Sequence, residues 1–142
     1  MVTKGMEQIY QEVADILVKM IPESWRDILL YAEMGERYRE LFFYYFPDIR
    51  NTPVSSLEMA DLFELDEQLF EPLEDQLYDA FLRLHQEFIL NGQEIWTTVT
   101  FRLNHEGKMK AKFDYDDLSS MSSAEKQTRW EMEYLDSQLQ EI

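Results

Sequence analysis

The stretch IWTTVTFRL, Ile95 to Leu103, is the clearest strand in the chain, because apolar and polar residues alternate along its whole length. The turn NHEG follows at 104–107, and a second alternating run after it predicts the return strand of an antiparallel hairpin. Lysines occupy one face of that return strand. The residues expected on its core-facing side are Met109, Ala111, Phe113 and Tyr115.

A second hairpin is predicted nearer the N-terminus, with strands at Asp27–Glu33 and Glu40–Phe46 on either side of a turn around Gly35. The later strand contains LFFYYF, which is aromatic on both faces. We therefore expect one face to cover the core, and the other to be buried by a helix or by a partner.

Helical periodicity is clear near both ends of the chain. The first helix is predicted at Met6–Met20, and Pro22 ends it. The last helix is predicted to begin at Ser122, where Glu125 completes the spacing of a capping box. It carries Trp130, Tyr134 and Leu135.

Between the hairpins the sequence predicts a short helix and a long one. The capping-box spacing of Ser55 and Glu58 predicts the short helix. Asp66 is a plausible cap for the long helix, which runs to Asn91, and we expect Pro72 to kink it or delay its start. The apolar stripe of this helix consists of Leu69, Leu73, Leu77, Phe81, Leu84 and Phe88.

The predicted order of elements is α-β-β-α-β-β-α, in which helices alternate with hairpins rather than with single strands. This order favours an α+β fold, with an antiparallel sheet of two hairpins packed against helices, over a doubly wound sheet. No linker or internal repeat divides the sequence, so we expect residues 1–142 to form a single domain.

The formal net charge is −16, from 29 acids against 13 bases. Such a field repels nucleic acid and anionic lipid, so we expect neither as a partner. The absence of cysteine excludes disulfides and thiolate zinc sites. Acids interrupt the apolar N-terminal stretch, unlike the core of a signal peptide, and no apolar run has membrane-spanning length. We therefore expect a cytoplasmic protein.

The most informative charge pattern is an acidic block between Asn51 and Leu82, which contains nine acids and no Lys or Arg. Two interpretations stay open: a solvated helix face that keeps the protein soluble, or a surface that binds a basic partner. Under the second interpretation the candidate contact residues are Asp61, Glu64, Glu67, Glu71, Glu74 and Asp75.

The segment FDYDDL, Phe113–Leu118, has the acid density of a metal site. Counted from Asp114, its acids and Glu125 match parts of a calcium-binding EF-hand loop, but the required glycine is replaced by Ser119. We therefore expect no metal and no other cofactor. The two histidines, His85 and His105, are not at ligand spacing and are expected to face solvent or hydrogen-bond locally.

Enzymatic motifs are missing from the sequence. It has no GxSxG elbow, no Gly-rich phosphate loop and no cysteine nucleophile. Paired carboxylates carry little weight as an acid and base, because 29 acids always supply some suitable pair. We do not expect an enzyme.

The chain resembles the YezG-like family of bacterial immunity proteins. The segments that carry the resemblance are IYQEVADILVKMIPESW, LYAEMGE, LFFYYF, QEFILNGQEIWTTVTF, FDYDDL and TRWEMEYL, in this order from Ile9 to Leu135. The resemblance implies a cytoplasmic antitoxin that neutralises an LXG-type polymorphic toxin of the type VII secretion system. The toxin domain that it would bind is typically a C-terminal nuclease.

The resemblance and the charge pattern meet in one hypothesis. A nuclease active site is basic, so an acidic surface would complement it. Besides the acidic block, the candidate contact residues are Asp116, Asp117, Trp130 and Tyr134, although core packing is the favoured role of the two aromatic residues. Before it binds the toxin, the protein would be a monomer or a weak homo-oligomer.

Two alternatives belong to other classes. A small acidic α+β protein is also suited to be a secretion chaperone that holds an effector before export. A metal-dependent enzyme would use Asp114, Asp116 and Asp117.

Overall fold

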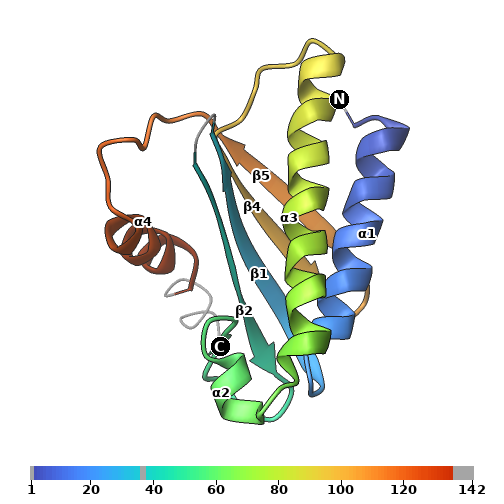
Figure 1. The fold of residues 1–142 in the computed structure, drawn as a ribbon, viewed down its shortest axis with the longest axis vertical. Coiled ribbons are helices and arrows are strands. Elements are labelled where there is room, and N and C mark those ends of the chain that lie inside the picture. The colour runs from blue at the N-terminus through green and yellow to red at the C-terminus, as the bar shows by residue number, and fades with distance from the viewer. Residues whose placement is uncertain (1, 36–37, 136–142) are drawn as a thin grey trace.

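Strand β1, Trp25–Met34, is the centre of a five-stranded antiparallel sheet with the order β3-β2-β1-β4-β5 (Figure 1). The structure is a computed structural model and describes residues 2–35 and 38–135. Strand β1 pairs with β2 on one side and with β4 on the other, so both predicted hairpins join in one sheet. The other strands are β2 Arg39–Pro47, β3 Val54–Ser55, β4 Thr98–Asn104 and β5 Met109–Asp114.

Helices cover both faces of this sheet. Helices α1, Lys4–Met20, and α3, Glu67–Leu90, lie side by side on one face (Figure 1). Helix α4, Ser123–Trp130, lies on the opposite face and continues into a π-helical turn, η1, Glu131–Leu135. The short helix α2, Met59–Phe63, precedes α3 near the end of β2. The α+β prediction with an antiparallel sheet is confirmed.

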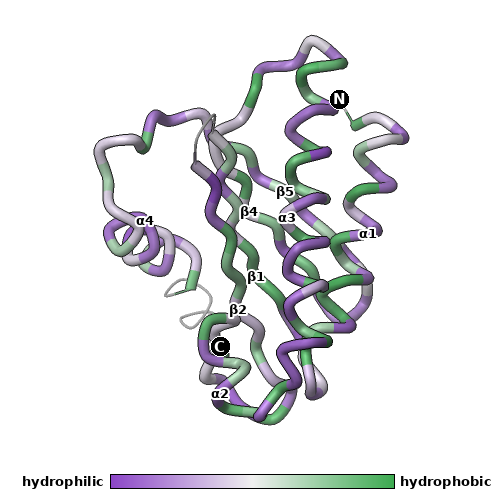
Figure 2. The backbone as a smooth tube through the Cα atoms, in the orientation of Figure 1, coloured by the Kyte–Doolittle hydropathy of each residue, from purple (hydrophilic) through white to green (hydrophobic). Residues whose placement is uncertain are grey.

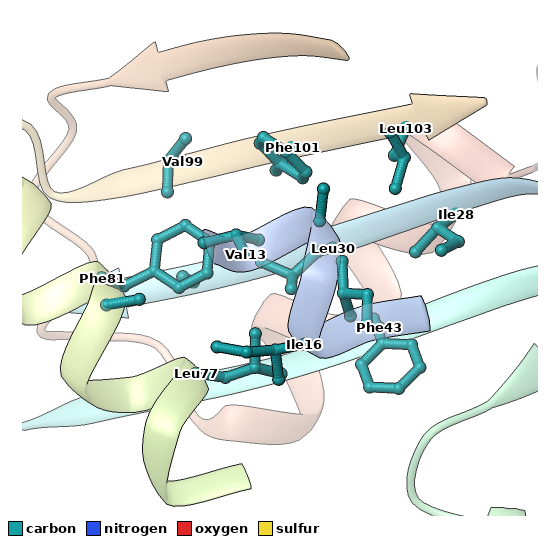
Figure 3. Packing of buried hydrophobic residues seen from close by; sticks show 14 of the residues in the cluster. Val13, Ile16, Ile28, Leu30, Phe43, Leu77, Phe81, Val99, Phe101 and Leu103 are labelled. Carbon is teal, nitrogen blue, oxygen red and sulfur yellow. The ribbon is translucent and has the colours of Figure 1, made fainter. Parts of the chain in front are cut away.

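The main core lies between the sheet and the pair α1 and α3. Apolar residues recur along both helices on the side that faces the strands, while hydrophilic residues occupy the outer side (Figure 2). Figure 3 shows side chains from α1 and α3 meeting side chains from β1, β2 and β4 in this layer. They include Val13, Ile16, Ile28, Leu30, Phe43, Leu77, Phe81, Val99, Phe101 and Leu103.

A second, smaller core lies beneath α4. It contains the other face of β1 and β2, together with two residues of the C-terminal helical segment. Its buried members are Leu29, Tyr31, Phe42, Tyr44, Phe46, Trp130 and Leu135. The two-faced burial expected of LFFYYF is therefore confirmed, and a helix of the same chain provides the cover.

Two of the three predicted caps are present. The Asp66 carboxylate accepts from the Gln68 N–H at 2.9 Å, and the Ser122 hydroxyl accepts from the Glu125 N–H at 3.2 Å. The cap predicted at Ser55 is wrong, because Ser55 belongs to β3 and α2 begins only after Glu58. Strand pairing with β2 takes precedence over the local capping pattern.

The strand predicted from Ile95 begins three residues later, at Thr98. The predicted alternation is wrong there, because Trp96 is fully buried and Ile95 is 47% exposed. Thr97 donates its backbone N–H and its hydroxyl to the Asp114 carbonyl, at 2.9 and 3.0 Å. Since Thr98 already pairs with Asp114, Thr97 is an extra residue that bends the chain and moves Trp96 to the core side.

Three further expectations need correction. Tyr115 is 44% exposed, because β5 ends before it. Leu69 is 72% exposed, because it lies in the first turn of α3, beyond the region that packs on the sheet. Pro72 does not delay the long helix, which begins at Glu67 directly after its cap.

No helix among the described residues is long and apolar enough to cross a membrane.

Candidate partner-binding surface

The outer side of α2 and α3 carries a concentration of carboxylates, which we call the acidic surface. It contains all six candidate residues of the acidic block and also Glu58. All members are exposed except Glu74, which is half-buried. The acidic surface consists of Glu58, Asp61, Glu64, Glu67, Glu71, Glu74 and Asp75.

A tight helix-to-helix connection brings these acids together. Met59 is fully buried, which fixes α2 against the main core. The helix ends at Glu64, whose φ of 50° lies in the left-handed region, and the Leu65 N–H donates to the Ala60 carbonyl at 3.2 Å. Asp66 then caps α3 immediately. Only residues 64–66 therefore separate the two helices, and the members of the acidic surface are exposed apart from the half-buried Glu74.

The acidic surface is not neutralised within the described part of the chain. No Lys or Arg there lies within 4.0 Å of its carboxylates, whereas Asp79, one turn further along α3, pairs with Arg83 at 2.9 Å. Burial raises the pKa of Glu74, and the nearby charges of Asp75 and Glu71 raise it further. The surface therefore holds repelling charges that a basic partner would stabilise.

Exposed leucines accompany these charges. Leu57, Leu62 and Leu69 are 65%, 60% and 72% exposed, and they lie before, within and after α2. Helical periodicity in the sequence did not predict these exposed leucines, because it placed Leu69 in the buried apolar stripe of the long helix. A typical protein interface has an apolar core and a polar rim, and exposed leucines beside carboxylates match this arrangement.

Asp116 and Asp117 do not lie on the acidic surface. They begin the loop that connects β5 to α4, and α4 lies on the opposite face of the sheet from α3 (Figure 1). Asp116 is 3.8 Å from the Arg129 guanidinium. The Asp117 carboxylate accepts from the Ser119 N–H at 3.0 Å, which lowers its pKa. The predicted site residues therefore fall into separate groups.

Trp130 and Tyr134 lie beneath α4, where they line the same cavity as Asp116. Trp130 is 4% exposed and donates its indole N–H to the Thr100 hydroxyl at 3.0 Å. Its ring stacks on Tyr44 at 5.8 Å and lies 5.4 Å from Tyr134. Core packing, the favoured role of these two residues, agrees with this position. In the free chain the indole is not available to a partner.

The three carboxylates considered for metal binding have different neighbours. Asp114 and Asp116 both line a cavity of about 110 Å³ under α4, and Asp116 also lies 3.8 Å from Arg129. The Asp117 carboxylate accepts from the Ser119 N–H instead. Within residues 2–35 and 38–135, no group of three or more His, Asp or Glu side chains is placed to hold a metal ion.

The histidines have the local roles expected of them. His85 is half-buried, and its Nε2 lies 3.2 Å from the Trp96 carbonyl. Burial lowers the pKa of His85, while the hydrogen bond to Trp96 raises it by a smaller amount. His105 is exposed in the turn between β4 and β5.

Sequence reasoning missed a buried ion pair that attaches α4 to the sheet. The Lys126 Nζ lies 3.1 Å from a Glu33 oxygen, and the Tyr31 hydroxyl donates to the other oxygen at 2.9 Å. Two signals were available. Glu33 interrupts an apolar strand, and Lys126 lies four residues before Trp130, on the same helical face.

The described chain thus carries an unneutralised acidic surface with exposed apolar neighbours. The chain belongs to the family of YezG-like immunity proteins, since that family's sequence profile, described as "Immunity protein YezG-like", matches residues 6–141.

Named relatives agree with this assignment. The chain is 28% identical to Immunity protein YezG of Bacillus spizizenii over 90% of this chain and 81% of that protein. It is 26% identical to Immunity protein YezG of Bacillus subtilis over 92% and 87%, respectively. It is also 30% identical to the type VII secretion system protein EsaG of Staphylococcus aureus over 79% and 69%.

Proposed function

We propose that this protein is an immunity protein that binds and neutralises a cognate toxin in the cytoplasm of the producing cell. The proposed partner is the basic C-terminal nuclease domain of an LXG-type toxin that is exported by the type VII system. The protein would act by occlusion, without catalysis. The observation that carries the proposal is the unneutralised acidic surface in a member of an immunity-protein family.

Charge and apolar contact have different roles in the proposed mechanism. Complementary charge accelerates encounter and rejects wrong partners, because it acts before contact and over distances of about 10 Å at 0.1 M salt. Affinity requires groups that become buried, and Leu62 and Leu69 are the exposed side chains available beside the carboxylates. A basic active-site region held against this surface would be closed to an anionic substrate.

The direct test is toxin activity. The toxin domain encoded by the neighbouring gene is purified and mixed with this protein. Nucleic-acid cleavage is then measured at increasing molar ratios of this protein to the toxin domain. We expect cleavage to stop near one equivalent. Full cleavage in a mixture that copurifies as a complex would contradict neutralisation.

The name of one relative supports a second role. EsaG is named as a protein of the type VII secretion system, which suits a secretion chaperone as well as an immunity protein. The same mixture separates the two roles. A pure chaperone would raise the solubility or the export of the toxin and leave its isolated activity intact, whereas an immunity protein abolishes that activity.

A further inference from the structure

The outer edge of β5 is open. In the β4–β5 hairpin the Asn104 N–H donates to the Lys108 carbonyl, and the Thr97 N–H donates to the Asp114 carbonyl. Because bonding direction alternates along an antiparallel strand, the even-numbered residues of β5 bond to β4. The backbone N–H and C=O groups of Met109, Ala111 and Phe113 therefore point away from the sheet. Within the described residues no group accepts or donates to them.

The opposite edge of the sheet is protected. Strand β3 pairs with β2 at Tyr44 and Tyr45. Next to it, Ser56 exchanges two hydrogen bonds with the Phe43 backbone, at 2.8 and 3.0 Å. An unprotected edge strand is a template for pairing with another chain. Of the two edges, β5 is the one with an uninterrupted row of free backbone groups.

Basic side chains line this open edge on the face that points toward α4. Lys110 and Lys112 are exposed, and Lys110 is directly opposite Arg102 across the hairpin. Like charges directly opposite each other destabilise a sheet. Arg102 pairs with Asp27 at 3.8 Å and Lys112 pairs with Glu133 at 3.7 Å, whereas Lys110 has no carboxylate within 4.0 Å among the described residues. The edge therefore holds positive charge that a negatively charged strand would stabilise.

The same lysines disfavour a second copy of this chain as the partner. An antiparallel pair of β5 strands centred on Ala111 sets Lys110 of each copy opposite Lys112 of the other. Registers centred on Lys110 or Lys112 set identical lysines opposite each other. Charge on an edge strand is a common means of preventing such self-pairing. The lysines of the β5 edge thus disfavour a basic strand, but they leave the edge open to an acidic one.

We propose that the β5 edge binds an extended acidic segment of a partner protein as a sixth strand. Backbone hydrogen bonds to Met109, Ala111 and Phe113 would supply affinity, and carboxylates at alternate positions would pair with Lys110 and Lys112. This surface lies at the opposite edge of the sheet from α2, so it is distinct from the acidic surface and does not depend on the function proposed above.

The test uses a synthetic peptide in which Glu alternates with Val and Thr, and a matched peptide in which Lys replaces every Glu. Binding to the full chain is followed by NMR. We expect the Glu peptide to bind at least tenfold more tightly and to slow amide hydrogen exchange at Met109, Ala111 and Phe113. Equal binding of both peptides, or protection elsewhere, would overturn the proposal.

Two substitutions at Ala111 distinguish backbone pairing with the β5 edge from non-specific electrostatic attraction of the peptide. Ala111→Pro removes an outward N–H but no bond to β4, so the fold should persist while the Glu peptide binds at least about tenfold more weakly. Ala111→Val keeps the N–H and should keep binding. Thermal unfolding of both variants checks the fold. Unchanged binding by a folded Ala111→Pro variant would show that the peptide does not pair with the edge.

Charge selection has its own variant. Lys110→Glu with Lys112→Glu should reverse the preference, so that the Lys peptide binds more tightly than the Glu peptide. A variant that still prefers the Glu peptide would contradict the assigned role of these lysines.

Discussion

At the scale of single residues, the Glu33–Lys126 ion pair shows how helix α4 is joined to strand β1. Both side chains are nearly removed from solvent, at 11% and 5% exposed. The Lys126 ammonium also lies 4.3 Å from the centre of the Tyr38 ring. Transfer of two charges from water is costly, so the net contribution of such a pair is small while both partners are present. The cost becomes visible when one partner is removed.

We predict that Lys126→Met lowers the free energy of unfolding by about 3–5 kcal/mol, because Glu33 would remain as an unpaired buried carboxylate. The double variant Glu33→Met with Lys126→Met should recover most of that loss. Chemical denaturation measures both. A double variant that is less stable than Lys126→Met alone would contradict this account of the pair.

His85 supplies a prediction of pH dependence. Burial lowers its pKa below the ordinary value of 6.5, so near and below that pH the folded state binds fewer protons than the unfolded state. Its contribution to stability is therefore present above pH 6.5 and decreases as the pH falls. NMR titration of the His85 ring should give a midpoint below 6.5. A midpoint at or above 6.5 would contradict the burial of the ring.

At the scale of elements, helix α4 is attached to the sheet by specific polar contacts around Trp130 as well as by the small core beneath it. The Gln127 side chain donates to the Tyr44 hydroxyl at 2.9 Å, and the Trp130 indole donates to Thr100. These two hydrogen bonds and the Lys126 ion pair can all form only when α4 lies in one position on the sheet. The small core beneath α4 therefore depends on this position.

The loop between β5 and α4 carries the prediction for Asp116 and Asp117. Both side chains are exposed, so Asp116→Asn with Asp117→Asn should leave the fold intact. If these aspartates meet a basic toxin surface, the variant should inhibit the toxin more weakly than the wild type. Activity of the toxin domain at equal molar ratios measures this. Unchanged inhibition would leave both residues with a role in the loop alone.

The sequence predicts elements well where one pattern operates without competition. The LFFYYF strand and the Asp66 and Ser122 caps have this property. Prediction fails where tertiary pairing intervenes, as at Ser55, which β2 recruits into the sheet, and at Thr97, which adds a residue opposite Asp114. Spacing along the chain contains no information about these distant partners.

The candidate site divides in the same way. The charge of α2 and α3 could be predicted from composition alone, since no base interrupts the acidic block. The separation of Asp116 and Asp117 from that block depends on which face of the sheet receives α4. That choice is made by the fit of Trp130 against Tyr44 and Phe42, which no local pattern reveals.

At the scale of the whole molecule, charge is unevenly distributed over a sheet with two covered faces. The net charge of −16 is concentrated in part on α2 and α3, while lysines line the β5 edge. A basic partner that approaches from a distance is attracted by the total charge and oriented by this asymmetry. We propose that the acidic surface, rather than the total charge, recognises the toxin.

The most direct test is the association rate with the toxin domain, measured against ionic strength for the wild type and two variants. Glu67→Lys with Glu71→Lys reverses charge on the acidic surface, and Glu94→Lys with Glu106→Lys makes the same net change elsewhere. We predict that salt slows the wild type, and that the first variant associates at least about tenfold more slowly than the control at low salt. Equal rates for both variants, or a wild-type rate insensitive to salt, would contradict the claim.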